Sequence, residues 1–338
     1  MPNRFWVGGT GTWNTTSTAN WSTTTGGASG ASAPGAADVA IFDANSGTGT
    51  VTLGATVTIQ RCTWNNYTGS FDPSTFEINL NSSGASSLWT GGTTATFLAI
   101  PTVNFTYAGA DPRTTSINSA TGFPRNINAN ITAGSGTFTL NGATNINNFN
   151  CTGFSGSLTN NATVNLTGNV TLSSSMTIAA GTSLILFSGS GNRTVTTNGV
   201  LIDRPMGLPA SASGGVVNFA DALTQGSTRA FTITAGTLKL KNGVTSTVGA
   251  FATSGTEQKF LSSTVAGSQA TLSQASGTVN VSNLTIQDIN ATGGAAWNAF
   301  IVDRNIANGN NNGWNFISIF NRIFGKKLVE RDVFKTVF

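Results

Sequence analysis

Hydrophobic and polar residues alternate with a period of two in many short runs along this chain of 338 residues. Alternation with this period places successive side chains on opposite faces of a β-strand, so each run predicts a strand with one buried face. Gly, Asn and Ser bound the runs, and these residue types favour turns. The predicted strands lie within residues 50–59, 76–80, 102–107, 126–131, 137–140, 162–172, 231–240 and 278–286.

An internal repeat narrows the choice of architecture. Residues 49–71 align with residues 136–158, and Cys62 and Cys151 fall at matching places, each followed by Thr. Shorter repeats of the type NVTLSSSMTIAAGTSLIL recur at steps of roughly 20 residues, the length of one turn of a β-solenoid. We therefore predict an all-β chain with a β-solenoid body similar to a parallel β-helix. Stacked β-sandwich domains are the alternative, because antiparallel strands make the same alternation.

The two ends of the chain are rich in Trp and Gly, in the stretches FWVGGTGTWNTTSTANW (5–21), TGGAAWNAF (292–300) and NGNNNGWNF (308–316). An open solenoid end exposes apolar side chains and unpaired strand edges, which have to be covered. A platform for sugar rings is the alternative role, but aromatic side chains serve packing more often than binding. We therefore predict that the following residues form end caps: Trp6, Trp13, Trp21, Trp297 and Trp314.

The chain divides into five segments on this interpretation. They are a Trp/Gly-rich cap and loop (1–48), a first stack of repeats (49–202), a joint loop (203–217), a second stack with its cap (218–315) and a tail (316–338). The joint is assigned because residues 203–217 contain two prolines and no alternation.

The tail differs from the rest of the chain, because its apolar residues follow a helical spacing with basic residues opposite. It could pack on its own body, dock on a partner protein or lie on a membrane surface. An exposed apolar stripe is an aggregation liability unless it is covered, so docking on a partner is favoured. The docking residues we predict are Phe316, Ile319, Phe320, Ile323, Phe324, Lys326, Lys327, Leu328, Arg331 and Val333.

Composition and charge exclude several classes of function. Charged residues make up 8% of the chain, so its polar surface consists mainly of hydroxyl and amide groups. Six of the 16 basic residues lie in the last 35 positions, and no basic stripe with interleaved aromatics precedes them, so nucleic-acid binding is not expected. No apolar run approaches the roughly 18 residues of a membrane span. The first residues lack the apolar core of a signal peptide, so Sec export is not expected either.

Few residues of the chain are candidates for catalysis or metal binding. The chain contains no His, the commonest general base and metal ligand. Asp38 and Asp43 are the closest carboxylate pair in the body, and glycoside hydrolysis would need them roughly 5–9.5 Å apart. Their position where a loop meets a strand favours turn hydrogen bonding instead, and a calcium site is a weaker alternative. Turn or cap roles are also predicted for Asp72, Asp111, Asp203 and Asp288.

The two cysteines lack a basic neighbour that would activate a thiol, so we interpret them as small buried apolar residues. We therefore expect no enzymatic activity, no cofactor and no bound metal.

The end motifs FWVGGTGTW…NW…DVAIFDA and TIQDINATGGAAWNAF…NGNNNGWNF resemble those of repeat-rich β-helical surface proteins. Such proteins occur in bacteriophages as tail-fibre-like or other virion proteins, and they are similar in style to autotransporter-like adhesins. The resemblance covers both ends and transfers no functional residue. It implies a structural virion protein, a fibre or capsid decoration that serves host attachment or particle assembly. The alternatives are a secreted or surface bacterial adhesin, and a polysaccharide lyase or hydrolase on a β-helix.

The partners expected on this basis are other virion proteins, bound through the tail, and further copies of the chain, with a trimer favoured. A host-surface glycan is a candidate ligand. The expected location is the virion, with the bacterial cell surface as the alternative.

Overall fold

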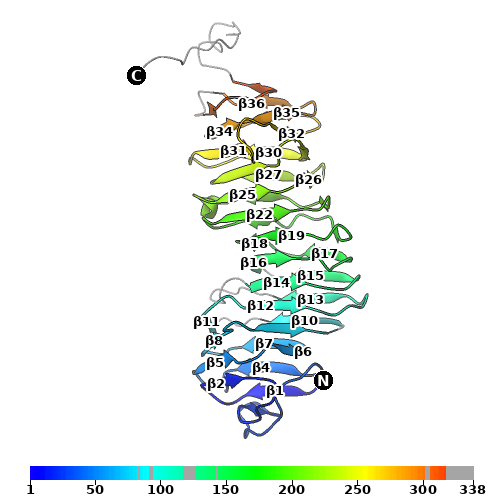
Figure 1. Ribbon diagram of the computed structural model, residues 1–338, viewed down its shortest axis with the longest axis vertical. Helices are drawn as coiled ribbons and strands as arrows, with labels where there is room; N and C mark the ends of the chain where they lie inside the picture. Colours follow the sequence, from blue (N-terminus) through cyan, green and yellow to red (C-terminus); the bar gives the residue numbers. More distant parts are fainter. Residues whose placement is uncertain (83, 91–93, 117–126, 142–143, 301–304, 317–338) are drawn as a thin grey trace.

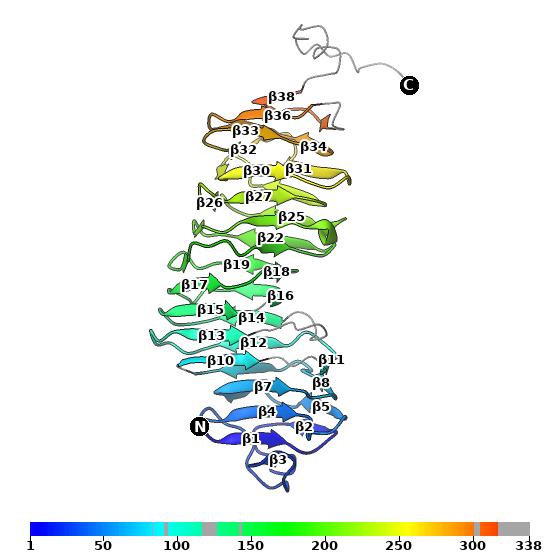
Figure 2. The ribbon, with the colours of Figure 1, turned by 180° about the vertical axis from the view of Figure 1, so that it is seen from behind.

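The structure is a computed structural model that describes residues 1–82, 84–90, 94–116, 127–141, 144–300 and 305–316. The chain is all-β and forms a β-solenoid of about 11 turns. The turns are stacked in sequence order into one rod, with the N-terminal turns at one end (Figures 1 and 2). Among the described strands, only β1 (Asn3–Trp6) and β3 (Trp21–Ser22) pair in the antiparallel direction, at the N-terminal end. This parallel stacking confirms the solenoid and rules out the β-sandwich alternative.

Three ladders of parallel strands form the walls of the N-terminal half. After β1, the first ladder continues with β4 (Val39–Asp43), β7 (Arg61–Asn65), β10 (Gly84–Thr90), β13 (Arg113–Ser116), β15 (Thr137–Asn141), β17 (Ser157–Asn160) and β20 (Thr177–Ile178). The second contains β2 (Gly11–Trp13), β5 (Thr50–Leu53), β8 (Ser70–Asp72) and β11 (Thr96–Phe97). The third begins with β6 (Val57–Ile59), β9 (Glu77–Leu80), β12 (Thr102–Phe105), β14 (Ile127–Ile131) and β16 (Thr144–Asn150).

The third ladder divides at β16, because the two ends of this long strand pair with different strands of the next turn. One branch begins at the first residues of β16. It continues with β18 (Val164–Leu166), β21 (Ile185–Phe187), β24 (Met206–Leu208), β27 (Ala230–Ile233) and β30 (Ala250–Thr253). The other branch begins at the last residues of β16. It continues with β19 (Val170–Thr171), β22 (Asn192–Thr196), β25 (Val216–Phe219), β28 (Thr237–Leu240), β31 (Lys259–Ser263), β34 (Leu284–Gln287) and β37 (Ile306–Ala307).

Two further ladders complete the C-terminal half. One contains β23 (Leu201–Ile202), β26 (Thr224–Gln225), β29 (Thr245–Thr247), β32 (Ala270–Ser273) and β35 (Ile289–Thr292). The other contains β33 (Thr278–Asn280), β36 (Ala296–Asn298) and β38 (Trp314–Asn315). The helical content of the described residues is one 3-10 turn, η1 (Ala210–Ala212).

The strands lie where alternation predicted them, and the long runs 50–59, 162–172 and 231–240 each contain two strands separated by a corner. The register also matches the predicted repeat length. Thr137 pairs with Ser157, and Ser157 pairs with Thr177, so one turn here spans 20 residues. Strand residues alternate between buried and more exposed positions because one face lines the interior.

Aromatic rings fill the interior of the N-terminal turns. Phe42 lies opposite Trp64 on the neighbouring strand, and their rings stack with centroids 4.2 Å apart and planes inclined by 11°. Phe42 also contacts the rings of Trp6, Trp13 and Trp21. One phenylalanine therefore joins the first turn to the third.

The segment predicted as a joint loop (203–217) differs from that expectation. It contains β24, η1 and the start of β25, and both strands pair with the turns before and after them. Pro205 and Pro209 flank β24 at its ends, where a missing N–H interrupts no pairing within the strand. The ladders therefore run through this segment without a break.

The tail lies almost entirely outside the described residues. Phe316 is described, and its partly buried side chain packs against the hydrophobic core. The predicted helix and the docking residues Ile319, Phe320, Ile323, Phe324, Lys326, Lys327, Leu328, Arg331 and Val333 lie outside them.

Substituting Phe42→Ala is expected to lower the free energy of unfolding by about 3–5 kcal/mol, because it removes a buried ring and leaves a cavity between turns. Phe260→Ala is the matched control, since Phe260 is 45% exposed on the outer face of β31. Its effect is expected to stay below about 1 kcal/mol. Urea denaturation followed by circular dichroism measures both values, and equal effects would contradict the packing described.

Candidate functional site

The outer face of the third ladder carries stacked asparagines. The side-chain amide of Asn104 donates to Asn79 at 2.8 Å, and that of Asn130 donates to Asn104 at 2.8 Å. Further along, Asn165 donates to Asn145 at 2.9 Å. An amide both donates and accepts, so a column of amides on successive turns satisfies itself without charge. This arrangement explains why a long outer surface carries few charged residues.

The predicted cap tryptophans lie in the first and last described turns. Trp6, Trp13 and Trp21 are fully buried, and Trp6 meets Trp21 edge to face with ring centroids 5.2 Å apart. At the other end, Trp297 and Trp314 are also buried, with ring centroids 5.0 Å apart. Their burial leaves no ring face free for a sugar, so these residues do not form the alternative sugar platform. Their energetic role as caps stays a prediction.

Asp38 and Asp43 lie too far apart for the two-carboxylate mechanism. They sit at opposite ends of β4, and five residues of strand span about 16 Å at about 3.3 Å per residue. Both make turn contacts, as the sequence predicted. Asp38 accepts a hydrogen bond from the Gly35 N–H at 2.9 Å, and Asp43 accepts one from the Asn45 N–H at 2.9 Å.

The other candidate carboxylates also form hydrogen bonds or ion pairs within the chain. Asp72 accepts from the Ser74 N–H at 2.8 Å. Asp111 accepts from the hydroxyl of Tyr107, and Asp203 pairs with Arg229. Asp288, which is buried, accepts from the Gly267 N–H and from the Asn310 amide. No group of three His, Cys, Asp or Glu side chains able to hold a metal occurs in the part of the chain that the structure describes.

Within the described residues, four cationic side chains are buried, and the alternation did not predict them. Arg113, Arg193, Arg204 and Lys259 are at most 3% exposed, and burial lowers the pKa of each group. Most of their hydrogen-bond acceptors are backbone carbonyls. For example, Lys259 donates to the carbonyls of Glu257 at 2.7 Å and Gly255 at 3.2 Å. Each of these cations therefore donates two or more hydrogen bonds to backbone carbonyls.

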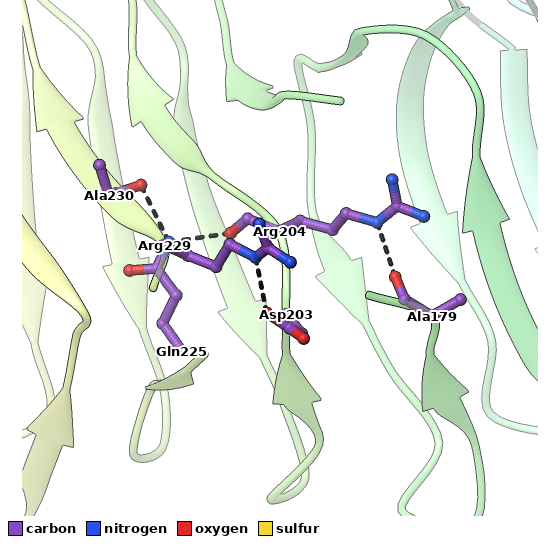
Figure 3. A network of polar contacts seen from close by, with 6 residues as sticks. All are labelled: Ala179, Asp203, Arg204, Gln225, Arg229 and Ala230. Atoms are coloured by element: carbon purple, nitrogen blue, oxygen red, sulfur yellow. Dashed lines mark hydrogen bonds and ion pairs between the residues drawn. The ribbon is translucent and has the colours of Figure 1, made fainter. Parts of the chain in front are cut away.

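Arg204 shows how one such cation joins several turns. Its Nε donates to the carbonyl of Ala179 at 2.7 Å (Figure 3). Its Nη1 donates to the carbonyl of Asn160 at 3.0 Å. Its Nη2 reaches the hydroxyl of Thr159, also at 3.0 Å. The five N–H donors of a guanidinium suit this task, because acceptors on two preceding turns lie within its planar fork.

The polar network around Arg204 continues into the next turn. The side-chain amide of Gln225 donates to the carbonyls of Arg204 at 2.9 Å and Ala230 at 3.0 Å. At the surface, Arg229 pairs with Asp203 through a contact of 2.6 Å (Figure 3). The buried Arg204 and the partly exposed Arg229 thus lie in one network but in different environments.

Both cysteines are buried and free. Burial raises the pKa of each thiol, so both stay protonated and poorly nucleophilic at neutral pH. This matches their interpretation as small core residues.

An open pocket of ≈ 450 Å³ lies on the outer face of the first ladder, near the N-terminal end. The strands β1, β4 and β7 that carry it lie one above another in Figure 2. Its apolar surface comes from Phe5, Ile41 and Ala44. Its polar lining consists of Thr25, Asp43, Asn45, Thr63, Asn65 and Asn66. Among the features of the described surface, this pocket brings together an aromatic ring, a carboxylate and several amides, so we treat it as the candidate site.

Of the residues that line the pocket, only Asp43 was predicted from the sequence as a candidate for chemistry. Phe5, Ile41 and Thr63 come from three different turns, and the register pairs Phe5 with Ile41 and Ile41 with Thr63. The alternation indicated which side chains face outward. It did not indicate which outward positions of different turns become neighbours.

Comparisons of the chain with protein-family models, curated proteins and solved structures find no match. Within the described residues, no helix has the length and apolar character needed to span a membrane.

Substituting Arg204→Ala is expected to lower the free energy of unfolding by about 2–4 kcal/mol, because it leaves buried acceptors unsatisfied. The control is Arg229→Ala, which removes a partly exposed ion pair worth about 0–1 kcal/mol. Urea unfolding of the two variants measures the difference. A cost for Arg204→Ala no larger than for Arg229→Ala would contradict a bridging role for the buried guanidinium.

Proposed function

We propose that this chain is a structural protein of a bacteriophage particle, a fibre or decoration that contributes to host attachment or assembly. The observation that carries the proposal is the continuous rod of about 11 parallel turns with closely packed aromatic turns at its N-terminal end. A rod of this kind can hold a binding surface at a fixed distance from a larger assembly. The outer columns of amides favour the same role, because they are stable without charges that respond to pH or salt.

The use of the carboxylates also supports a structural role. In the described residues, eight carboxylate side chains are hydrogen-bonded to turn, corner or neighbouring ladder groups, and so they hold the coils in place. These residues are Asp38, Asp43, Asp72, Glu77, Asp111, Asp203, Asp221 and Asp288.

The proposal includes the partners expected from the sequence. The tail (316–338) docks on another virion protein, because its apolar stripe needs a cover and its basic residues can meet an acidic surface. Assembly into a homotrimer belongs to the same proposal. The location proposed is the virion.

Immunogold electron microscopy of the native source, with antibodies raised against the folded chain, tests the proposed function. We expect label at a fixed position on phage particles. Label on the bacterial envelope, with none on particles, would contradict the virion assignment and favour a surface adhesin. Antibodies against an unrelated capsid protein provide the positive control for intact particles.

The same particles also report on the tail. Lys326, Lys327 and Arg331 are trypsin sites, so a docked tail is expected to resist cleavage in particles and to be cut in the isolated chain. Equal rates of cleavage in the two samples would contradict docking through the tail.

A further inference from the structure

The pocket on the first ladder contains an aromatic ring without an aromatic partner. Phe5 faces outward from β1 and is half-buried, and no ring stacks on it among the described aromatic pairs. Ile41 lies next to it on the following turn, and Ala44 lies at the edge of the same pocket. The pocket therefore has an apolar part formed by a half-buried ring and two aliphatic side chains. All of the residues that line the pocket belong to the described part of the chain.

One side of the pocket carries a polar group that is already held in place. The hydroxyl of Thr25 donates to the Asp43 carboxylate at 2.6 Å. The backbone N–H of Asn45 also donates to this carboxylate, at 2.9 Å, and the side-chain amide of Asn45 donates to the Thr25 hydroxyl at 2.9 Å. These contacts fix the direction of the carboxylate before any ligand arrives, and preorganisation of this kind favours binding.

The pocket also carries amides that are free to bind. Asn65 and Asn66 are exposed, and their side chains make no hydrogen bond within the described residues. Asn65 pairs with Asp43 in the strand register, so its side chain leaves the sheet next to the carboxylate. Asn66 has a positive φ of 59°, a conformation that Asn tolerates better than most residues. Each free amide can donate to one hydroxyl and accept from another.

We propose that this pocket binds one neutral pyranose unit of a glycan. The axial and equatorial C–H groups of a pyranose form an apolar face that can pack on Phe5 and Ile41, while its hydroxyls reach the carboxylate and the amides. The volume of ≈ 450 Å³ lies within the range of about 300–1,000 Å³ that is usual for small-molecule sites. The lining contains one carboxylate and no Lys or Arg, so a sugar acid would meet a like charge without a compensating cation.

The inference deepens the proposed function, because a glycan site near the end of a rod would give host attachment a chemical basis. The sugar-site proposal and the virion proposal can be tested separately. Sugar binding is measured on the isolated chain, whereas the virion assignment is measured on particles. If the isolated chain binds no sugar but the label is found on particles, only the pocket proposal is overturned.

Saturation-transfer difference NMR of the full chain tests the site. The probes are the methyl glycosides of glucose, galactose, mannose and N-acetylglucosamine, with methyl glucuronide as the anionic comparison. We expect at least one neutral glycoside to bind and the glucuronide to give no signal. If no neutral glycoside binds, or if the glucuronide binds equally well, the proposal is overturned.

Variants locate the binding on the pocket. Phe5→Ala and Asn65→Ala are each expected to weaken binding by about tenfold or more, the effect of losing one good contact of about 1.4 kcal/mol. Phe5→Tyr retains the ring and is expected to bind. Phe260→Ala removes an exposed phenylalanine from a distant turn and is expected to leave binding unchanged.

Asn65 is exposed and unbonded, so Asn65→Ala is expected to fold even if Phe5→Ala does not. Thermal unfolding of each variant identifies any loss of structure. Unchanged affinity in a folded Asn65→Ala variant would place the sugar elsewhere and overturn the proposal, whether or not Phe5→Ala folds.

Discussion

Main-chain hydrogen bonding between successive turns is the constraint on which the rest of this structure depends. Each strand finds its partner one turn away, so every turn has to present the same inward positions at the same places. Outward side chains then stack on their counterparts about 4.8 Å away. Like charges at that distance repel, whereas amides such as Asn79 and Asn104 hydrogen-bond to each other. The low charge of the chain follows from this geometry.

The corners of the rod have to satisfy backbone groups that the ladders leave unpaired. Arg204 does so by donating to carbonyls of two preceding turns, and Lys259 does so by donating to carbonyls of its own turn. A buried cation is costly in water-free surroundings, and its hydrogen bonds offset part of that cost only if the turns are in register. The buried cations and the ladders thus depend on each other, and both depend on the spacing of the turns.

Much of the fold could be predicted from the sequence, because alternation and repeat length are local signals. The strand positions, the solenoid and the burial of Cys62 and Cys151 follow from them. The prediction of a joint loop at 203–217 was wrong, because Pro205 and Pro209 flank a strand that is paired on both sides. The buried cations were not predicted, because an Arg next to a turn has the same local pattern as a surface Arg. The pocket at Phe5 depends on register between turns, which no single stretch of sequence encodes.

The rod and the pocket suggest that different parts of the chain have different roles. In the proposed function the stacked turns act as a spacer, and the first turns carry the pocket, in which polar groups surround the half-buried ring of Phe5. The tail follows the last described turn, at the other end of the sequence. In the proposed function, one end of the chain attaches to the particle and the other presents the candidate site.

Native-state hydrogen exchange tests most directly whether the rod is one unit held together by hydrogen bonds between turns. The account predicts that amides of β24 and β25 open with the same free energy as those of β21, β22, β27 and β28, because the ladders run through them. Fast exchange confined to residues 203–217, with the flanking turns opening as two separate blocks, would contradict it.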